Sequence, residues 1–130
     1  KLKKTIVVSN CDILVDIDYY DLYEFHKKNN YDLIIVSAFK TVGVPYGNIE
    51  LDKNGNFIKM NEKPVQNFLI NTGFYIFDNH ILGEIPKNTF LNFDKLVHKL
   101  NRKKFKIGTY PIDEKLWKDI GQSPEYDKRK

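Results

Sequence analysis

Two buried-strand patterns separated by one helix pattern constrain this chain more than any other feature of its sequence. Thr5–Ser9 and Asp32–Phe39 are runs of β-branched and other apolar residues, which is typical of strands covered on both faces. Between them, Leu22 and Phe25 recur at helical spacing, and Asp18 is a candidate N-cap. A strand, a helix and a second strand within about 35 residues predict a βαβ unit. The expected fold class is therefore α/β.

The remainder of the chain predicts more strands, three helices and one tight turn. Asn54-Gly55 lies between two strand-like runs and is a strong hairpin signal. We expect strands over 46–51, 57–61, 72–77, 105–112 and 116–120, and helices over 79–85, over 93–103 and from Ser123 onward.

Composition argues against several functional classes. The 130 residues suffice for one domain with a packed core, and the single cysteine excludes an internal disulfide framework. The net charge is +4, but the lysines are scattered and only two arginines occur, which argues against nucleic-acid binding. No apolar run approaches the roughly 20 residues that span a bilayer. We expect a protein of the reducing cytoplasm with neither nucleic-acid nor membrane partners.

Two carboxylates stand where strands are expected to end. Asp12 follows the first buried strand, and in open α/β sheets ligands bind beyond the carboxyl ends of strands. Asp119 lies within a strand-like segment although Asp is depleted in strands. Two such carboxylates could share one Mg²⁺, which keeps waters and binds substrate phosphates. The alternative is that Asp12 is a turn residue that bonds its own backbone, and that Asp119 only ends a strand before a glycine turn.

Three short polar segments are further candidates for ligand contact. Glu62-Lys63-Pro64 closes a strand, with Lys63 expected in extended backbone before the proline and suited to a phosphate. Tyr46-Gly47 and Asn71-Thr72-Gly73 place glycines where a ligand could approach the backbone. Without further context, a solvated Glu-Lys pair and ordinary turns are the favoured explanations of these segments.

Other chemical motifs carry less weight. Asp16-Ile17-Asp18 matches the Asp-x-Asp pattern of metal-dependent glycosyltransferases, but it lies at an expected helix start, where acidic residues are favoured anyway. Cys11 has no inferable histidine partner. The three histidines do not have metal-ligand spacing and are expected to be structural or surface residues.

The order of the polar segments along the chain resembles the sugar-1-phosphate nucleotidylyltransferases. Asn10-Cys11-Asp12 stands where many members have Asn-Gly-Asp, and this variant is most similar to the mannose-1-phosphate guanylyltransferase-like branch. The matching segments are Val8–Leu14, Val44–Gly47, Ile49–Asp52, Glu62–Pro64, Asn71–Tyr75, Ile85–Lys87 and Trp117–Gly121.

The resemblance implies a fold and a reaction. The fold would be part of a Rossmann-like, three-layer nucleotidyltransferase domain with a mixed, mainly parallel sheet. The reaction would join an NTP, with GTP as one candidate, to a sugar 1-phosphate, giving a nucleotide sugar and pyrophosphate. The implied roles are Mg²⁺ binding by Asp12 and Asp119, phosphate binding by Lys63, and sugar binding by Glu62, by Tyr46-Gly47 and by Asn71-Thr72-Gly73.

One departure from the family is large. Its members begin with a glycine-rich phosphate loop ending in an arginine, and nothing here matches that loop. We expect residues 1–130 to be the carboxy-terminal, sugar-phosphate-binding part of the domain, weakly active or inactive alone, without the amino-terminal NTP-binding part. An uncovered sheet edge would favour a homo-oligomer. A non-catalytic sugar-phosphate-binding or regulatory module and a glycosyltransferase fragment remain alternatives.

Overall fold

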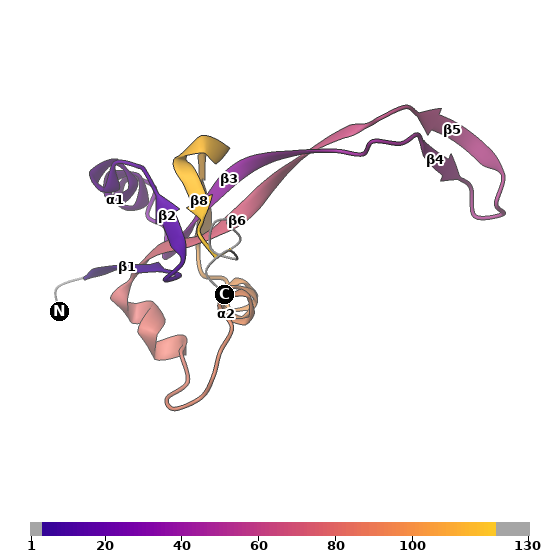
Figure 1. Cartoon of the computed structure of the whole chain (residues 1–130). Helices are drawn as coiled ribbons and strands as arrows, with labels where there is room; N and C mark the ends of the chain where they lie inside the picture. Colours follow the sequence, from indigo (N-terminus) through magenta and orange to yellow (C-terminus); the bar gives the residue numbers. More distant parts are fainter. Residues whose placement is uncertain (1–3, 122–130) are drawn as a thin grey trace, which may run out of the picture.

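A four-stranded sheet forms the body of the protein (Figure 1). The computed structural model describes residues 4–121. In spatial order, the strands are β1 (Thr5–Ser9), β6 (Val65–Asp78), β3 (Leu33–Gly43) and β7 (Ile107–Ile112).

The sheet is mixed, as predicted, and three of its four strands run in the same direction. β6 is inserted between β1 and β3 and runs antiparallel to both, and β3 pairs in parallel only with β7. Since β1 and β3 both oppose β6, they run in the same direction. The expected strand-helix-strand unit therefore exists, with a third strand between its two strands.

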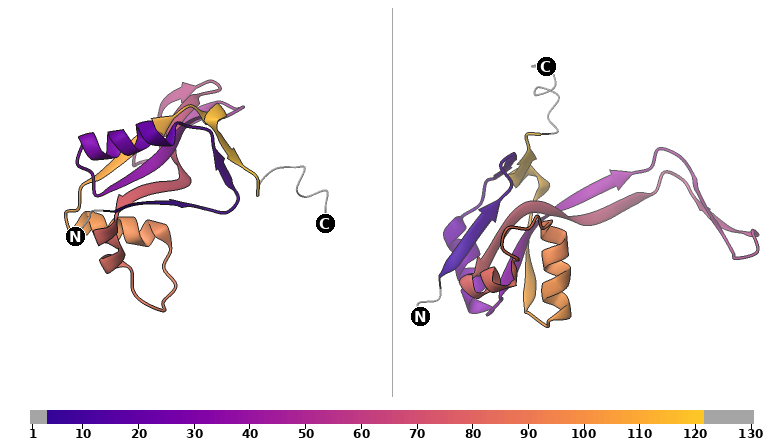
Figure 2. Two further views of the ribbon diagram at one scale, coloured as in Figure 1. Left: turned by 90° about the vertical axis from the view of Figure 1, so that its left-hand side faces the viewer. Right: turned by 90° about the horizontal axis from the view of Figure 1, so that it is seen from below.

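Two helices cover opposite faces of this sheet, which confirms the three-layer α/β arrangement (Figure 2). α1 (Tyr19–Lys28) places Leu22 in a core with Ile34 and Val36 of β3. α2 (Phe93–Arg102) places its buried leucines against Leu33, the neighbouring β3 residue that points to the other face.

Short elements complete the body. η1 (Asn79–Glu84) replaces the helix expected over 79–85 with a 3₁₀ helix, and η2 (Glu114–Leu116) is another. β2 (Ile13–Val15), which the sequence did not predict, pairs with β8 (Trp117–Asp119). The helix expected from Ser123 lies outside the described residues.

A two-stranded arm projects from the body (Figures 1 and 2). It consists of the outer parts of β3 and β6, which remain paired from Phe39↔Leu69 to Gly43↔Val65. Beyond them, β4 (Asn48–Leu51) and β5 (Phe57–Asn61) form a hairpin at the outer end. Gly55 has φ +85° in the hairpin loop, which confirms the turn predicted at Asn54-Gly55.

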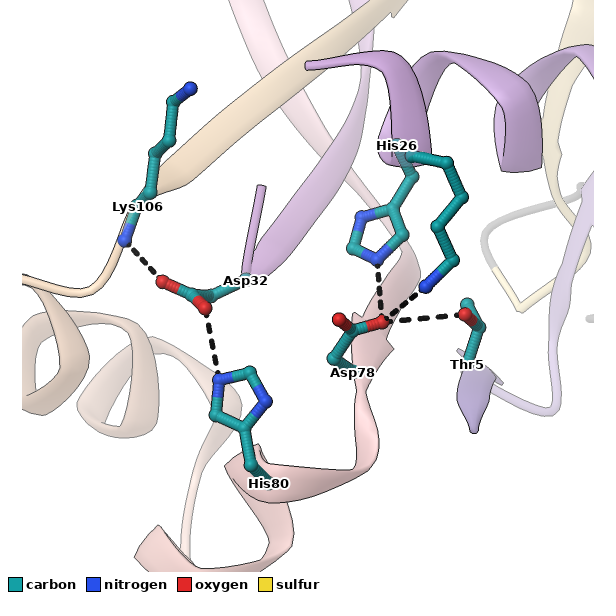
Figure 3. Close-up of polar contacts among 7 residues, drawn as sticks. Thr5, His26, Asp32, Asp78, His80 and Lys106 are labelled. Atoms are coloured by element: carbon teal, nitrogen blue, oxygen red, sulfur yellow. Dashed lines mark hydrogen bonds and ion pairs between the residues drawn. The ribbon is translucent and has the colours of Figure 1, made fainter. Parts of the chain in front are cut away.

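A buried polar network fixes α1 to the inner end of β6 (Figure 3). Oδ1 of Asp78 lies 3.0 Å from Nε2 of His26 and 2.7 Å from Nζ of Lys27, and it accepts a 3.3 Å hydrogen bond from Thr5. Burial raises the pKa of Asp78, but the hydrogen bonds from Lys27 and His26 outweigh it and lower the pKa from 3.8 to about 2. His26 is thus structural, as expected.

Candidate functional site

The pairing of β2 with β8 brings Asp12 and Asp119 together. Ile13 is opposite Asp119, and the Ile120 N–H donates a 2.8 Å hydrogen bond to the Asp12 carbonyl. A β-carbon on Gly121 would lie 2.8 Å from Oδ2 of Asp12 and 3.3 Å from Oδ1 of Asp119. Two carboxylates more than a hundred positions apart in sequence therefore border one space, which a glycine leaves open.

These two carboxylates could hold a divalent cation with few protein ligands. Asp12 is exposed and Asp119 is half-buried, so both can reach solvent. Within residues 4–121, no group of three or more His, Cys, Asp and Glu side chains has metal-binding geometry. An ion held here would complete its shell with water and substrate oxygens, which is the usual mode for Mg²⁺.

The backbone of β6 packs directly against the segment that carries Asp12. The Asn10 N–H donates a 3.0 Å hydrogen bond to the Gly73 carbonyl. Gly73 has φ +80°, and a β-carbon there would lie 2.7 Å from Nδ2 of Asn10. The left-handed backbone favours glycine at this position, and a β-carbon would also force the exposed Asn10 side chain to move.

The polar side chains of the Asn71-Thr72-Gly73 segment are largely engaged by the fold. Asn71 accepts a 3.0 Å hydrogen bond from the Gly73 N–H and donates one of 2.8 Å to the Tyr75 hydroxyl. The hydroxyl of the buried Thr72 donates to the Val36 carbonyl at 2.7 Å. Nε1 of Trp117 donates to the Thr72 carbonyl at 3.1 Å, which ties this segment to β8 and Asp119.

A second group of candidate residues gathers on the arm. A β-carbon on Gly47 would lie 3.0 Å from Oε2 of Glu62 and 3.3 Å from Sδ of Met60, so the segments Tyr46-Gly47 and Glu62-Lys63 lie beside each other. Tyr46 is 73% exposed. The arrangement offers an exposed aromatic ring, a carboxylate and an ammonium group on one structural element.

The expected extended backbone at Lys63 is wrong, because this residue has φ +45°. The chain turns here between β5 and β6, and the Val44 N–H donates a 3.0 Å hydrogen bond to the Pro64 carbonyl directly afterwards. The left-handed conformation costs about 1–2 kcal/mol for a residue other than glycine. The hydrogen bonding of the arm therefore overrides the local preference of a residue before proline.

The structure thus divides the predicted site residues between two places (Figures 1 and 2). Asp12, Asp119 and the segment Asn71-Thr72-Gly73 lie in the body, where β2, β6 and β8 meet. The segments Tyr46-Gly47 and Glu62-Lys63 belong to the arm that carries the β4–β5 hairpin.

The second carboxylate of the competing Asp-x-Asp motif, that of Asp18, has a structural role. Oδ1 of Asp18 accepts hydrogen bonds from the backbone N–H groups of Tyr20 at 2.7 Å and Asp21 at 3.2 Å. These contacts make Asp18 the N-cap of α1, as the sequence predicted.

Comparison with known proteins decides the family. The sequence model described as "Nucleotidyl transferase" matches residues 1–128. The chain belongs to the nucleotidyl transferase family.

Named relatives within this family act on sugar 1-phosphates. The chain is 31% identical to a UTP–glucose-1-phosphate uridylyltransferase of Synechocystis over 94% of its own length and 33% of the relative's. It is 27% identical to a mannose-1-phosphate guanylyltransferase of Mycobacterium tuberculosis, over 94% of this chain and 35% of that protein. The chain spans about a third of the length of these curated relatives.

Solved structures support the same fold. HddC from Yersinia pseudotuberculosis superposes with a TM-score of 0.61 at 24% identity, over 95% of this chain and 53% of that one. A nucleoside-diphosphate-sugar pyrophosphorylase from Vibrio cholerae gives a TM-score of 0.59 at 19% identity, over 98% and 56%. Among residues 4–121, no helix is long and apolar enough to cross a membrane.

Sequence reasoning missed three residues that shape the candidate site. Gly121 leaves the space between the carboxylates, Asn10 packs on Gly73, and Trp117 holds the Thr72 carbonyl. Gly121 and Asn10 each lie two positions from a predicted carboxylate, and that proximity was the available signal. The hydrogen bond of Trp117 spans 45 positions and has no local signature.

Proposed function

We propose that this chain supplies the metal and sugar-phosphate part of a sugar-1-phosphate nucleotidylyltransferase. The observation that carries the proposal is the convergence of Asp12 and Asp119 on the space left by Gly121. In the reaction, a phosphate oxygen of the sugar 1-phosphate bonds to the α-phosphorus of an NTP, the bond to the β-phosphate oxygen breaks, and pyrophosphate leaves. Such a transfer depends mostly on positioning and on charge neutralisation.

Asp12 and Asp119 would hold Mg²⁺. When bound, the ion neutralises negative charge on the reacting phosphate and orients it. The residues themselves fit the ion, since two solvent-reachable carboxylates leave room for water and phosphate oxygens. The hydrogen bond between Asn10 and Gly73 holds the segment that carries Asp12 against β6, so the first carboxylate is fixed before the ion binds.

Lys63 would bind the phosphate of the sugar 1-phosphate, and Glu62 would accept hydrogen bonds from sugar hydroxyls. The packing of Glu62 against Gly47 supports one sugar-binding surface that includes Tyr46. Asn71, Thr72 and Gly73 would contribute mainly backbone groups, because the hydroxyl of Thr72 and the amide of Asn71 already bond within the fold. For these groups to share one substrate with Asp12 and Asp119, the arm must fold over the body.

The choice of nucleotide is a separate proposal. The M. tuberculosis relative is named a mannose-1-phosphate guanylyltransferase, and HddC was solved in complex with GMP-PN. These names favour GTP as the nucleotide, bound largely by an NTP-binding part that residues 1–130 would lack. We place the reaction in the cytoplasm and expect residues 1–130 alone to show little turnover.

A metal-binding experiment on this chain tests the carboxylate pair without requiring turnover. Mn²⁺ added as a probe should broaden the NMR signals of Ile13, Ile120 and Gly121 selectively. D119N should abolish this broadening. D16N, which removes the exposed carboxylate of Asp16 next to β8, should leave it unchanged. Equal broadening in the wild-type chain and in D119N would refute the metal assignment.

An activity assay then tests the reaction. In a protein that carries this chain together with an NTP-binding part, D12N and D119N should each lower pyrophosphate release by at least about a hundredfold. Retained binding of the sugar 1-phosphate without pyrophosphate release in the wild type would favour the non-catalytic module. Loss of activity in D16N and D18N alone would favour the glycosyltransferase alternative.

A further inference from the structure

β6 contains a bulge at the point where it passes the candidate site. Val36 and Ser37 are neighbours in β3, but the register of β6 shifts between them. The shift leaves Thr72-Gly73 as two extra residues on β6, with no opposite residues in β3. The glycine has φ +80°, a left-handed conformation that occurs in one class of bulge. Thr72-Gly73 is called the β6 bulge below.

Side-chain hydrogen bonds hold the β6 bulge in shape. The hydroxyl of the buried Thr72 donates to the Val36 carbonyl at 2.7 Å and accepts a 3.3 Å hydrogen bond from the Phe74 N–H. The side chain of Asn71 accepts a 3.0 Å hydrogen bond from the Gly73 N–H. These contacts occupy the side chains, whereas the two carbonyls of the bulge accept hydrogen bonds from outside the β3–β6 pair.

The two carbonyls of the β6 bulge anchor the two segments that carry the candidate metal ligands. The first carbonyl accepts a 3.1 Å hydrogen bond from Nε1 of Trp117, which lies two positions before Asp119. The second accepts a 3.0 Å hydrogen bond from the N–H of Asn10, which lies two positions before Asp12. Both segments are therefore fixed to consecutive residues of one strand.

A third hydrogen bond joins the two anchored segments to each other. The Ile120 N–H donates to the Asp12 carbonyl at 2.8 Å, so each segment is held both by the bulge and by the other segment. A regular strand uses its carbonyls in the ladders with its neighbours, whereas a bulge interrupts the ladder and re-aims the groups beside it. The bulge thus makes two backbone acceptors available where Asp12 and Asp119 meet.

We propose that the β6 bulge sets the relative position of Asp12 and Asp119, and that Trp117 is the positioning residue for Asp119. This role rests on the proposed metal site, which the bulge would hold ready for the ion. Asn10 supplies its donor from the backbone, as any residue except proline could. The donor of Trp117 belongs to its side chain, so this anchor depends on the identity of the residue. Groups that hold metal ligands in place typically strengthen metal binding by about 10- to 100-fold.

An isosteric replacement of Trp117 tests this role. Trp117 is the only tryptophan of the chain, so it can be replaced during expression by benzothienylalanine, which has sulfur in place of the ring N–H. This analogue keeps the shape of the ring and removes only the donor to the Thr72 carbonyl. The dissociation constant for Mn²⁺, measured from the broadening of the Gly121 NMR signal, should rise about tenfold.

Asn29→Ala is the matched control. The Asn29 side chain donates a 2.8 Å hydrogen bond to the Phe25 carbonyl at the C-terminal end of α1, where none of the candidate ligands lies. N29A therefore also removes one side-chain donor to a backbone carbonyl, but it should leave the dissociation constant for Mn²⁺ unchanged. Urea unfolding of both variants measures how much stability each one loses.

Hydrogen exchange in the unmodified chain tests the same coupling without a variant. The indole N–H of Trp117 gives a single NMR signal, and its exchange reports opening of the bond to the Thr72 carbonyl. If this bond strengthens ion binding about tenfold, the ion must stabilise the bond by the same factor. Saturating Mg²⁺ should therefore slow the exchange about tenfold.

The proposal is overturned if the wild-type and analogue chains bind Mn²⁺ equally well, or if Mg²⁺ leaves the indole exchange unchanged. An equal loss of affinity in N29A would also overturn it, because metal binding would then follow overall stability. Should the analogue chain not fold, the exchange measurement decides alone. Absence of Mn²⁺ binding in the wild-type chain is a different failure, since it removes the proposed metal site itself and this role with it.

Discussion

Removing the Asp78 carboxylate should make the free energy of unfolding of the chain less dependent on pH in the acidic range. Asp78 is buried and receives hydrogen bonds from His26, Lys27 and Thr5 on a single oxygen. Asp78→Asn keeps the shape of the side chain and removes the charge that these donors stabilise. The substitution therefore isolates the electrostatic part of the contact between α1 and β6.

The magnitude follows from the lowered pKa. The pKa of Asp78 falls from 3.8 to about 2 in the folded chain. Each pKa unit corresponds to about 1.4 kcal/mol, so the ionised carboxylate adds about 2 kcal/mol to the free energy of unfolding. Because the folded state binds the proton more weakly, this contribution is complete above the unfolded pKa and is lost as the pH falls through the folded pKa.

Urea unfolding of the wild-type chain and D78N, measured at intervals from about pH 5 down to about pH 2, checks this expectation. The stability advantage of the wild type should shrink by about 2 kcal/mol across that window. D16N serves as the control because Asp16 is exposed, and its difference from the wild type should stay nearly constant. A constant difference between the wild type and D78N would refute the assigned role of Asp78.

Two further substitutions test the left-handed backbone positions Gly73 and Lys63, which belong to the predicted site residues. G73A should lower the free energy of unfolding, measured by urea unfolding, by about 2 kcal/mol, because it places a β-carbon at φ +80° and 2.7 Å from Asn10. G83A is the control: a β-carbon at Gly83 meets no atom within 4 Å, so this substitution should change stability little. K63G should leave the free energy of unfolding within about 0.5 kcal/mol of the wild-type value, because relief of the left-handed strain offsets the greater chain entropy of glycine in the unfolded state. It should weaken the binding of a sugar 1-phosphate, measured by calorimetry. Equal stability of G73A and G83A, or unchanged binding by K63G, would contradict these assignments.

Local sequence patterns determined most of the secondary structure. The buried runs gave β1 and the inner part of β3, the helical spacing gave α1 and α2, and Asn54-Gly55 gave the hairpin turn. These features depend on neighbours within a few residues, which is why a single sequence contains them. The order of the polar segments also sufficed to indicate the family, which the match over residues 1–128 confirmed.

Long-range pairing was decided only by the tertiary structure. No local pattern indicates that β6 enters between β1 and β3, that β2 pairs with β8, or that Lys63 adopts φ +45°. The residues alone left a shared site of Asp12 and Asp119 as one of two alternatives, which the resemblance then favoured, and no sequence feature indicated the space at Gly121. Strand partners and close backbone approaches depend on residues far apart in the chain, so the sequence determined which elements form, whereas three-dimensional packing decided which of them meet.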